Sequence, residues 1–559
     1  MSYSLRTRAT PYLFLAPVLI LFLAFKAYPV GYAFYLSLTT RQGGADTFTG
    51  LDNFSRVLSD PLFWTAFRNT AEILAVQVPV MLVLAILLAV AFDSKVLKAR
   101  AFFRVSYFVP IVMGLIAYGI VFSALLNYQN GFLNWVLTSI GLPRISWLGD
   151  PFWARMSIVM ALTWHYLGYN AVIYLAQLQS IPQELYEAAS VDGANRWHQF
   201  RHVTLPGLRP AIVLTVVLST IGTLQLFEEP YVLTNGGPDN ATLTIGMYLY
   251  ENAFKYFDFG YASAIGYVLT GIVVLLALAR CSSSGARVMT RLSVFLTTFI
   301  ALGAVIMVAP FVWLVIATTH TTGEIFSTPP HLLPGTAFWD NLSGLFTENR
   351  FGDAIRNSVV VSATSTVLGV FICSAAGYAF AKFDFPGRTL IFGVILASMT
   401  LPSQVTLVPL FQIMVSAGWL NSYPALILPN LAVPFGIFLM RQAMQGVPDE
   451  LLQAARIDGA GEARVFFQVV LPVMRPALSA LAIFLFLGQW NDFVYPLTVL
   501  RTADAYTVPV ALASLQGVSS TDYGQLLTGT FLSVVPVLIL FLFLQRQFVA
   551  GLLAGSVKQ

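Results

Sequence analysis

Long apolar runs separated by short polar gaps recur from one end of the 559-residue chain to the other. Each run approaches the roughly 20 apolar residues that a helix needs to cross a lipid bilayer, and equal numbers fall in the two halves of the chain. The pattern predicts an all-α integral membrane protein with about twelve transmembrane helices. The first run is too long for a signal peptide and lacks a small-residue cleavage site, so we expect it to be retained. The predicted spans are residues 12–36, 70–92, 104–126, 155–178, 210–233, 261–280, 292–318, 356–380, 388–414, 421–443, 476–499 and 523–547.

The composition supports this interpretation and excludes several classes of protein. Hydrophobic residues make up 57% of the chain and charged residues 10%, whereas soluble proteins have about 25% charged residues. A chain of this composition is not a disordered tail, a secreted disulfide scaffold or a nucleic-acid-binding protein. Cys281 and Cys373 form no CxxC pair, so they indicate neither redox chemistry nor a thiolate metal site.

The distribution of charge predicts which ends of the helices face the cytoplasm. An even number of spans places both termini on one side of the membrane. Lys and Arg concentrate in the two tails and in the gaps on that same side, whereas most acidic residues lie on the other. The positive-inside rule therefore predicts cytoplasmic termini. One basic residue, Lys26, lies within the first predicted span instead.

An internal repeat is the most informative feature of the sequence. Residues 181–211, IPQELYEAASVDGANRWHQFRHVTLPGLRPA, align without gaps to residues 447–477, VPDELLQAARIDGAGEARVFFQVVLPVMRPA, and about half of the aligned positions are identical. Each copy lies in the predicted cytoplasmic gap after the fourth span of its half. Equivalent gaps carrying the same segment indicate that the two six-helix halves are homologous.

Each copy is predicted to form a short helix, a tight turn and a second short helix that leads back into the membrane. Gly193 and Gly459 follow an aspartate and are expected to end the first helix in the left-handed conformation. The Leu-Pro pairs at 205–206 and 471–472 are expected to end the second helix before the next span. A helix face rich in alanine buries little area in lipid but allows close approach by a protein, which favours docking to a partner over a connector on the membrane surface.

The repeat resembles the EAA loop of ABC importer permeases, in which EAA, two residues and DGA precede a Leu-Pro pair and a transmembrane helix. Both copies have this spacing, and the second departs from the pattern at Gln453, where the motif has glutamate. In that family the loops form coupling helices that dock onto two ABC ATPase subunits. The docking residues that the resemblance implies are Glu187, Ala188, Ala189, Asp192, Gly193, Ala194, Gln453, Ala454, Ala455, Asp458, Gly459 and Ala460.

The resemblance is more specific within each half. FTGLDNF at 48–54 and YVLTNGGPDNAT at 231–242 resemble MalF-type sugar permeases, whereas FAKFDFPGR at 380–388 and GQWNDFVYPL at 488–497 resemble the MalG type. The chain is thus identified as two carbohydrate-uptake permeases fused into one polypeptide, which implies the type I ABC importer transmembrane fold. The expected division is a MalF-like half at 1–280, a cytoplasmic linker at 281–291 and a MalG-like half at 292–559.

The resemblance also implies a set of partners. Members of this family lie in the prokaryotic cytoplasmic membrane, receive substrate from an extracytoplasmic solute-binding protein and are not themselves enzymes. The sequence contains no GxxxxGK[ST] phosphate loop, so ATP and Mg²⁺ are expected on the partner ATPases and no cofactor or metal on this chain. The binding protein is expected to dock on the external segments 37–69, 127–154 and 319–355.

Polar residues at membrane depth are candidates for the substrate path, because they are costly unless they face a wet cavity. They gather near the fifth span of each half, where aromatic rings stand beside amide and carboxylate groups suited to a sugar. At an offset of 264 residues, Glu228 aligns with Asp492 and Tyr231 with Tyr495. Packing between helices is an alternative for all of them, and for Trp164, His165, Tyr169 and Asn170 of the fourth span. The candidates are Gln225, Glu228, Glu229, Tyr231, Gln489, Trp490, Asn491, Asp492 and Tyr495.

Other functions share part of this pattern. An ion-gradient-driven secondary transporter also has two six-helix halves, but it needs no duplicated cytoplasmic docking segment. A membrane scaffold would bind partners without moving a solute. We expect an importer of a sugar-type substrate, either an oligosaccharide, a disaccharide or a compound similar to glycerol phosphate. A non-sugar cargo such as an oligopeptide, phosphate or a polyamine stays open, because the repeated loop specifies coupling and not cargo.

Overall fold

The computed structural model describes residues 3–42, 45–94, 97, 100–280, 294–516 and 521–554, and most of these residues are helical. Within the described ranges, the sheet structure is limited to one antiparallel hairpin, in which β1 (Thr39–Gln42) pairs with β2 (Ala45–Phe48). The all-α prediction is confirmed. The predicted linker at 281–291 lies outside the described residues.

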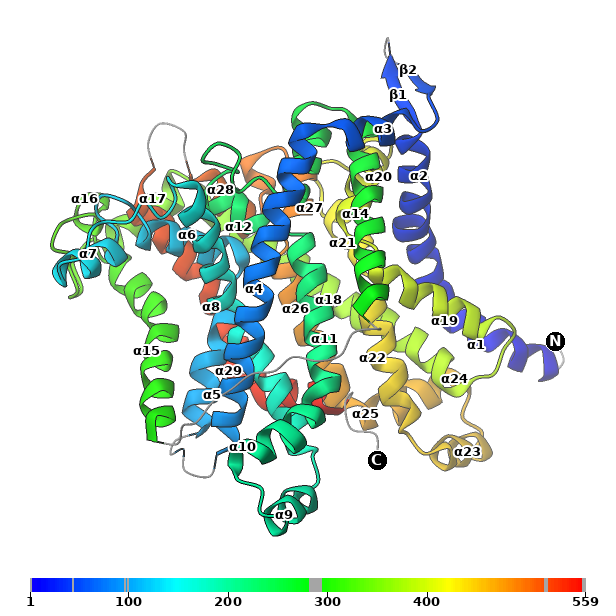
Figure 1. Cartoon of the computed structure of the whole chain (residues 1–559). Helices are drawn as coiled ribbons and strands as arrows, with labels where there is room; N and C mark the ends of the chain where they lie inside the picture. Colours follow the sequence, from blue (N-terminus) through cyan, green and yellow to red (C-terminus); the bar gives the residue numbers. More distant parts are fainter. Residues whose placement is uncertain are drawn as a thin grey trace.

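Helices able to cross a membrane form the body of the molecule (Figure 1). Among the described residues, seven helices are long and apolar enough to do so alone, and four bent helix pairs raise the number to eleven. The sixth predicted span corresponds to α14 (Phe259–Arg280), whose shorter apolar stretch is Phe259–Leu275. Every predicted span therefore falls on helical segments.

The first half begins with a helix that contains a π turn. α1 (Tyr3–Phe22) and α2 (Tyr28–Ser37) are joined through the π turn Leu23–Ala27, and the span Ala9–Ser37 runs through all three. The other helices of this half are α3 (Asp52–Ser59), α4 (Pro61–Asp93), α5 (Arg100–Phe108), α6 (Leu115–Leu125), α7 (Phe132–Ser139), α8 (Pro151–Gln179), α9 (Gln183–Val191), α10 (Arg196–Gln199), α11 (Leu205–Leu224), α12 (Glu228–Leu233) and α13 (Ile245–Tyr250).

The described part of the second half has a similar succession of helices, without a counterpart of the β1–β2 hairpin. Its first span is a single helix, α15 (Val294–Ala317), and its last is α29 (Tyr523–Ala554). The helices between them are α16 (Thr322–Ile325), α17 (Phe338–Thr347), α18 (Phe351–Lys382), α19 (Arg388–Ala397), α20 (Gln404–Ser416), α21 (Tyr423–Ile427), α22 (Pro434–Gln445), α23 (Asp449–Ile457), α24 (Glu462–Arg464), α25 (Leu471–Val473), α26 (Arg475–Trp490), α27 (Val494–Val499) and α28 (Val508–Ser514).

Three spans predicted as single helices are bent. The chain bends by 99° between α5 and α6, by 104° between α19 and α20, and by 44° between α21 and α22. Leu401 and Val433 precede prolines at the last two bends and are extended, with ψ of 127° and 113°. A proline disfavours the helical conformation of the residue before it, so these bends follow from the local sequence.

The predicted fifth spans, 210–233 and 476–499, are each two helices. α11 ends at Leu224 and α26 at Trp490, and the short helices α12 and α27 follow. Phe227 and Phe493 take the same non-helical conformation at the two breaks. A proline follows three residues after each phenylalanine, where its ring would clash with the carbonyl of the preceding turn in a continuous helix. The breaks correspond at the 266-residue offset of the repeat, and not at the offset of 264.

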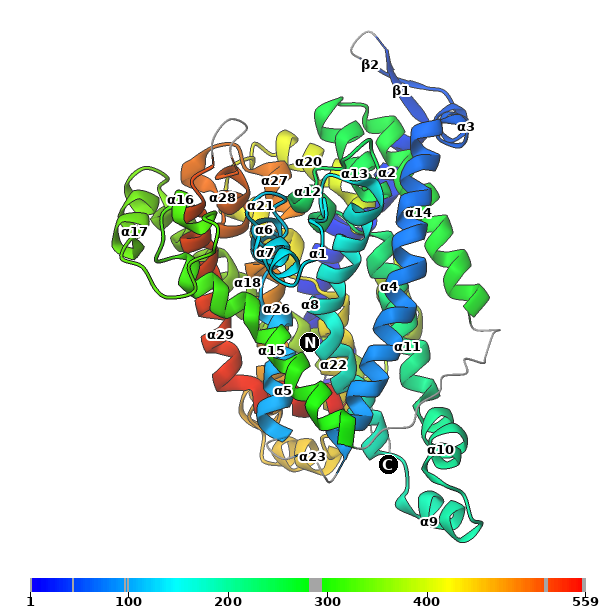
Figure 2. The ribbon, with the colours of Figure 1, turned by 60° about the vertical axis from the view of Figure 1, so that its left-hand side comes forward.

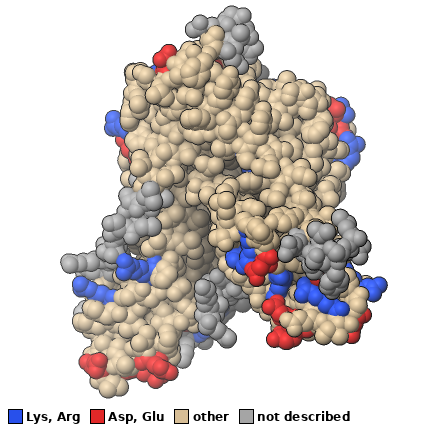
Figure 3. Space-filling model, turned by 90° about the vertical axis from the view of Figure 1, so that its right-hand side faces the viewer, with Lys and Arg blue, Asp and Glu red and all other residues tan. Residues whose placement is uncertain are grey.

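The two copies of the repeat lie at the same end of the molecule. In Figures 1 and 2, α9 and α23 protrude at the bottom, and the β1–β2 hairpin stands at the opposite end. Lys, Arg, Asp and Glu side chains gather near both ends of the face shown in Figure 3. This arrangement places both predicted docking helices on one surface of the protein.

The N-terminal helix packs against the second half of the chain. The Phe14 ring meets the rings of Tyr378 and Phe466 at centroid distances of 5.2 and 5.3 Å. The Tyr12 hydroxyl donates a hydrogen bond to the Pro386 carbonyl at 3.1 Å. Helix α1 of the first half therefore contacts the second half directly, through residues that are not part of the predicted linker.

Candidate docking helices and central cavity

Both copies of the repeat form the predicted short helix and end it in the same way. Gly193 and Gly459 have φ of +78° and +81°, as predicted. The amide of Ala194 donates to the carbonyl of Ala189 at 2.9 Å, and the equivalent bond of the second copy has the same length. These are the hydrogen bonds of a helix end closed by a left-handed glycine. Helix, cap and turn are thus duplicated.

Two exposed apolar side chains recur at equivalent positions of α9 and α23. Leu185 and Leu451 are 51% and 44% exposed, and Val191 and Ile457 are 88% and 86% exposed. Large apolar side chains this exposed at the end of a polar helix suit contact with another protein. The sequence already placed Leu185 and Leu451 on one face with the alanines of each repeat. Val191 and Ile457 were not among the predicted docking residues, although an apolar residue directly before each Asp-Gly pair could have indicated them.

The second copy is fixed to the body of the protein. Arg456 forms two hydrogen bonds to Glu462, at 2.7 and 3.1 Å, and the Tyr378 hydroxyl of α18 donates to the same carboxylate at 2.9 Å. Lys382 of α18 donates to Asp449 at 2.6 Å. The hydrogen bond from Lys382 lowers the pKa of Asp449, and the hydrogen bond to Glu462 raises the pKa of Arg456. Two contacts therefore tie the start and the end of α23 to α18.

The first copy has a weaker attachment. Among the described residues, α9 has no buried side chain, whereas Leu452 of α23 is buried. Its contacts are neutral hydrogen bonds, such as that between the Tyr186 and Thr204 hydroxyls at 3.0 Å and that from Gln199 to Ser190 at 2.7 Å. The ion pairs of the described residues include none in α9.

The Leu-Pro pairs do not end the second helix, so that prediction is wrong. In the first copy, Arg196–Leu224 is one continuous span, and the π turn Phe200–Thr204 precedes the pair. In the second copy, the helix bends by 84° after Val473, beyond the pair. A π turn changes the hydrogen-bond register of the helix by one residue. It lies directly before the Leu-Pro pair in both copies, so the helix passes the proline, which has no N–H to donate, without ending there.

A polar cavity of about 310 Å³ lies between the two halves. Four of the predicted path residues line it, namely Glu228, Gln489, Asp492 and Tyr495. A fifth, Gln225, borders it through its backbone, because its carbonyl accepts a hydrogen bond from the lining residue Gln404 at 2.9 Å. Polar residues that the sequence analysis did not select also line the cavity: Lys26, Ser365, Ser403, Gln404, Thr406 and Asn430.

Lys26 could have been predicted to line the cavity, because it is a charged residue within the first predicted span. The polar residues of α18, α20 and the turn before α22 could not, because serine, threonine and amide side chains are common within membrane helices. Only the packing of helices that are distant in the sequence brings these residues to one cavity.

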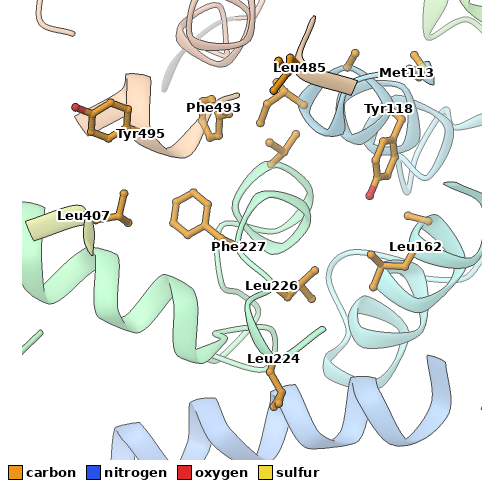
Figure 4. Close-up of a cluster of buried hydrophobic side chains, with 14 of the residues drawn as sticks. Met113, Tyr118, Leu162, Leu224, Leu226, Phe227, Leu407, Leu485, Phe493 and Tyr495 are labelled. Atoms are coloured by element: carbon orange, nitrogen blue, oxygen red, sulfur yellow. The ribbon is translucent and has the colours of Figure 1, made fainter. Parts of the chain in front are cut away.

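Aromatic side chains from both halves meet next to the cavity. Tyr231 stacks on Phe227 at a centroid distance of 5.2 Å and meets Phe493 of the second half at 5.7 Å. Figure 4 shows Phe227 and Phe493 approaching each other with Leu407 and Tyr495 beside them. Tyr231, a predicted path residue, therefore belongs to an aromatic cluster that joins the halves.

The remaining path candidates make packing contacts. The Tyr118 hydroxyl donates to Glu229 at 2.5 Å, and the indole N–H of Trp490 donates to the Ser533 carbonyl at 3.1 Å. Asn491 lies against Gly114, where its side-chain oxygen would be 2.6 Å from an added Cβ. These three residues do not line the central cavity.

The fourth-span residues also lie in packed surroundings. His165 is buried and stacks on Tyr118 at 4.5 Å, and Trp164 packs against Phe122 at 5.3 Å. Asn170 donates to the Tyr166 carbonyl of its own helix at 3.0 Å. Tyr169 packs beside the buried cluster that contains Trp490. Their positions agree with the packing alternative.

Comparison with known proteins identifies the family. The family model described as binding-protein-dependent transport system inner membrane component matches residues 1–288 and 368–552. The lactose transport system permease protein LacF of Rhizobium radiobacter is 41% identical over 271 residues, which are 48% of this chain and 91% of that protein. The arabinooligosaccharides transport system permease protein AraQ of Halalkalibacterium halodurans is 40% identical over 270 residues, 48% of this chain and 97% of that protein.

The chain is also similar to a protein of known structure. A bacterial ABC transporter involved in the import of the acidic polysaccharide alginate aligns with 48% of this chain and 93% of its own chain, at 26% identity and a TM-score of 0.44. The family model matches in both halves of the chain, and each relative aligns almost in full with about half of it. The chain therefore belongs to the family of binding-protein-dependent transport system inner membrane components, with two permease units in one polypeptide.

Proposed function

We propose that this chain is the membrane permease of an ATP-driven, binding-protein-dependent ABC importer for sugars. It would lie in the cytoplasmic membrane of a prokaryote with both termini inside. Two ABC ATPase subunits would supply ATP hydrolysis and hold the Mg²⁺, and a solute-binding protein would deliver substrate to the outer surface. The chain itself would carry no catalytic residue.

The duplicated docking helix is the observation that carries this proposal. α9 and α23 lie at one end of the molecule, share the same cap and expose the same apolar positions. Two equivalent surfaces suit a partner with two-fold symmetry, as a pair of ATPase subunits would provide. A secondary transporter has no use for such a pair.

The names of the relatives support a sugar as the cargo. LacF is named for lactose transport and AraQ for arabinooligosaccharides. The central cavity suits such a solute, since the amides of Gln404 and Gln489 both donate and accept hydrogen bonds. The aromatic ring of Tyr495, which lines the cavity, can cover the apolar face of a sugar ring.

Alternating access would use the elements described above. Closure of the ATPase subunits on ATP would move α9 and α23 towards each other, and the two halves would rotate about the aromatic cluster of Phe227, Tyr231 and Phe493. The central cavity would then face the outer surface and receive sugar from the binding protein. Hydrolysis of ATP would return it to the inner side.

Uptake by the complete transporter tests this function. The full chain is reconstituted in proteoliposomes with its ATPase subunits and binding protein, and radiolabelled lactose and arabinooligosaccharides are offered. ATP-dependent accumulation that survives an ionophore is expected. Accumulation that collapses with the ion gradient, or that proceeds without the ATPase, would show a secondary transporter instead.

The orientation is tested by labelling single cysteines in a variant that lacks Cys281 and Cys373. Ser190→Cys in α9 and Gln453→Cys in α23 are expected to react with an impermeant maleimide only from the cytoplasmic side. Thr47→Cys in the β1–β2 hairpin is expected to react only from outside. Labelling of α9 or α23 from outside would contradict the proposed docking role.

A further inference from the structure

The central cavity carries three ionisable side chains from both halves of the chain. Lys26 comes from the π turn of the N-terminal span, Glu228 from the start of α12, and Asp492 from the break between α26 and α27. Among the described residues, no ion pair within 4.0 Å includes any of the three. Lys26 and Asp492 attract each other without such a direct pair, and the backbone amides of Phe493 and Tyr495 hydrogen-bond to the Asp492 carboxylate.

The backbone presents Lys26 to this cavity. The residue lies in the π turn Leu23–Ala27, and π turns within α-helices are frequent at functional sites. Its neighbour Leu23 is 59% exposed on the outer surface of the helix, as suits a lipid-facing side chain. A lysine at membrane depth is costly unless it faces a wet space, so the cavity accounts for a position that lipid would not.

The other polar side chains of the cavity wall are uncharged. Gln404, Gln489 and Asn430 offer amide groups, and the Tyr495 hydroxyl, which donates to the Ala425 carbonyl at 3.0 Å, keeps its oxygen as an acceptor. Hydroxyl groups of a sugar can pair with all of these. They can also form the stronger, charge-assisted hydrogen bonds with the two carboxylates and the ammonium group.

A sugar that carries a carboxylate also interacts electrostatically with the charged side chains of the cavity, unlike an uncharged sugar. Two carboxylates and one ammonium group line the cavity, and charges interact more strongly there than in water because the surroundings have a low dielectric constant. We propose that Lys26, Glu228 and Asp492 form a subsite that spans the two halves and selects uncharged sugars over acidic ones. The inference rests on the proposed function for its class of substrate.

Direct binding to the permease tests the selectivity without the binding protein. The full chain with its ATPase subunits is placed in lipid nanodiscs, and saturation-transfer NMR measures binding of lactose against its C6′ uronate and of cellobiose against its C6′ uronate. Each acid differs from its parent sugar by oxidation of one hydroxymethyl group to a carboxylate, and both sugar rings are retained. The uncharged member is expected to bind about tenfold more tightly, a factor that one nearby like charge can supply in such surroundings.

Variants that change the charge in opposite directions sharpen the test. Glu228→Gln with Asp492→Asn leaves Lys26 as the charge of the subsite and is expected to reverse the preference towards the acids. Lys26→Met is expected to strengthen the exclusion of the acids. Asp384→Asn is the matched control, because Asp384 is 99% exposed and pairs with Arg388 away from the cavity.

Equal binding of the acid and its parent sugar by the unmodified chain would overturn the proposal, as would the absence of binding by both uncharged sugars. An unchanged preference in the Glu228→Gln, Asp492→Asn variant would do the same. Should that variant fail to assemble, the comparison on the unmodified chain and on Lys26→Met still decides. ATP-driven uptake by the complete transporter is measured separately, so a failed subsite and a failed importer remain distinguishable.

Discussion

At the scale of single residues, the two capping glycines carry the clearest consequence. Gly193 and Gly459 have positive φ, and a Cβ added at either would meet nothing within 4 Å. The requirement for glycine at these two positions therefore comes from the backbone conformation and not from a lack of space for a side chain. A β-branched residue is strongly disfavoured at such angles, whereas asparagine adopts them more readily.

The first prediction follows from that difference. Val at both glycine positions is expected to destabilise each helix end by about 1–2 kcal/mol and to lower transport at unchanged membrane insertion. Asn at both positions is expected to retain most transport. The measurement is ATP-dependent uptake with the quantity of inserted protein determined in parallel. Gly461→Ala, at a glycine with φ of −70°, is the control, and full activity of the double Val variant would contradict the prediction.

Asp60 is a second residue whose contacts predict a specific effect on stability. It caps α4 through a 2.8 Å hydrogen bond from the Leu62 amide, and it also accepts hydrogen bonds from the Tyr248 and Tyr261 hydroxyls. Burial raises the pKa of Asp60, but these hydrogen bonds together lower it below its ordinary value of 3.8. A lowered pKa means that the contribution to stability is complete above pH 3.8 and is lost as the pH falls through the lowered value.

We therefore expect Asp60→Asn to lower the stability of the full chain by about 1–2 kcal/mol at pH 7, since a charged cap and charge-assisted bonds are replaced by neutral ones. The effect is expected to be constant from pH 5 to pH 8. Thermal unfolding in nanodiscs measures it. Asp52→Asn, at an exposed position of α3, is the control, and an equal loss in both variants would contradict the role given to Asp60.

At the scale of elements, the two docking helices are alike in sequence and unlike in attachment. α23 is held to α18 by Tyr378 and Lys382, whereas α9 relies on neutral hydrogen bonds. Segments with few buried contacts open more often. Amide exchange of the chain without ATPase subunits is therefore expected to be faster in α9 than in α23.

A double variant tests the cause of that asymmetry. Tyr378→Phe with Lys382→Met removes both hydrogen-bond donors and is expected to raise exchange in α23 towards that of α9 while leaving α9 unchanged. Tyr256→Phe, at a side chain that is 61% exposed and distant from α23 in the sequence, serves as the control. Equal exchange in α9 and α23 of the unmodified chain would show that these contacts do not restrain α23.

At the scale of the whole molecule, the two halves contact each other through residues that lie outside the predicted linker. Phe14 of α1 packs on Tyr378 and Phe466, and Gln404 of α20 binds the Gln225 carbonyl. We expect residues 1–280 and 292–559 to copurify when they are co-expressed as separate chains. The linker raises the effective concentration of one half around the other, but it does not supply the contacts between them.

A substitution in α1 tests this expectation. Phe14→Ala is expected to reduce copurification of the separate halves, since it removes a large ring from the packed interface. Leu13→Ala, at a side chain that is 74% exposed, is the control. Failure of the unmodified halves to copurify, with both inserted in the membrane, would mean that the linker is required.

The sequence by itself determined the features that depend on neighbours in the chain. Apolar runs predicted the membrane helices, and the Asp-Gly pairs predicted the left-handed ends of α9 and α23. The repeat predicted two equivalent loops. The first two depend on hydropathy or backbone preference within one short segment, and the repeat depends on the likeness of two segments, so no knowledge of distant contacts was needed.

Only the tertiary structure decided how those segments meet. Among nine polar candidates near the fifth spans, it turned Glu228, Gln489, Asp492 and Tyr495 to the central cavity and Trp490 to packing. It also added Lys26 and Gln404, which come from parts of the chain far from either fifth span. Facing and burial depend on which helices pack together, and that is a property of the assembled halves and not of any one segment.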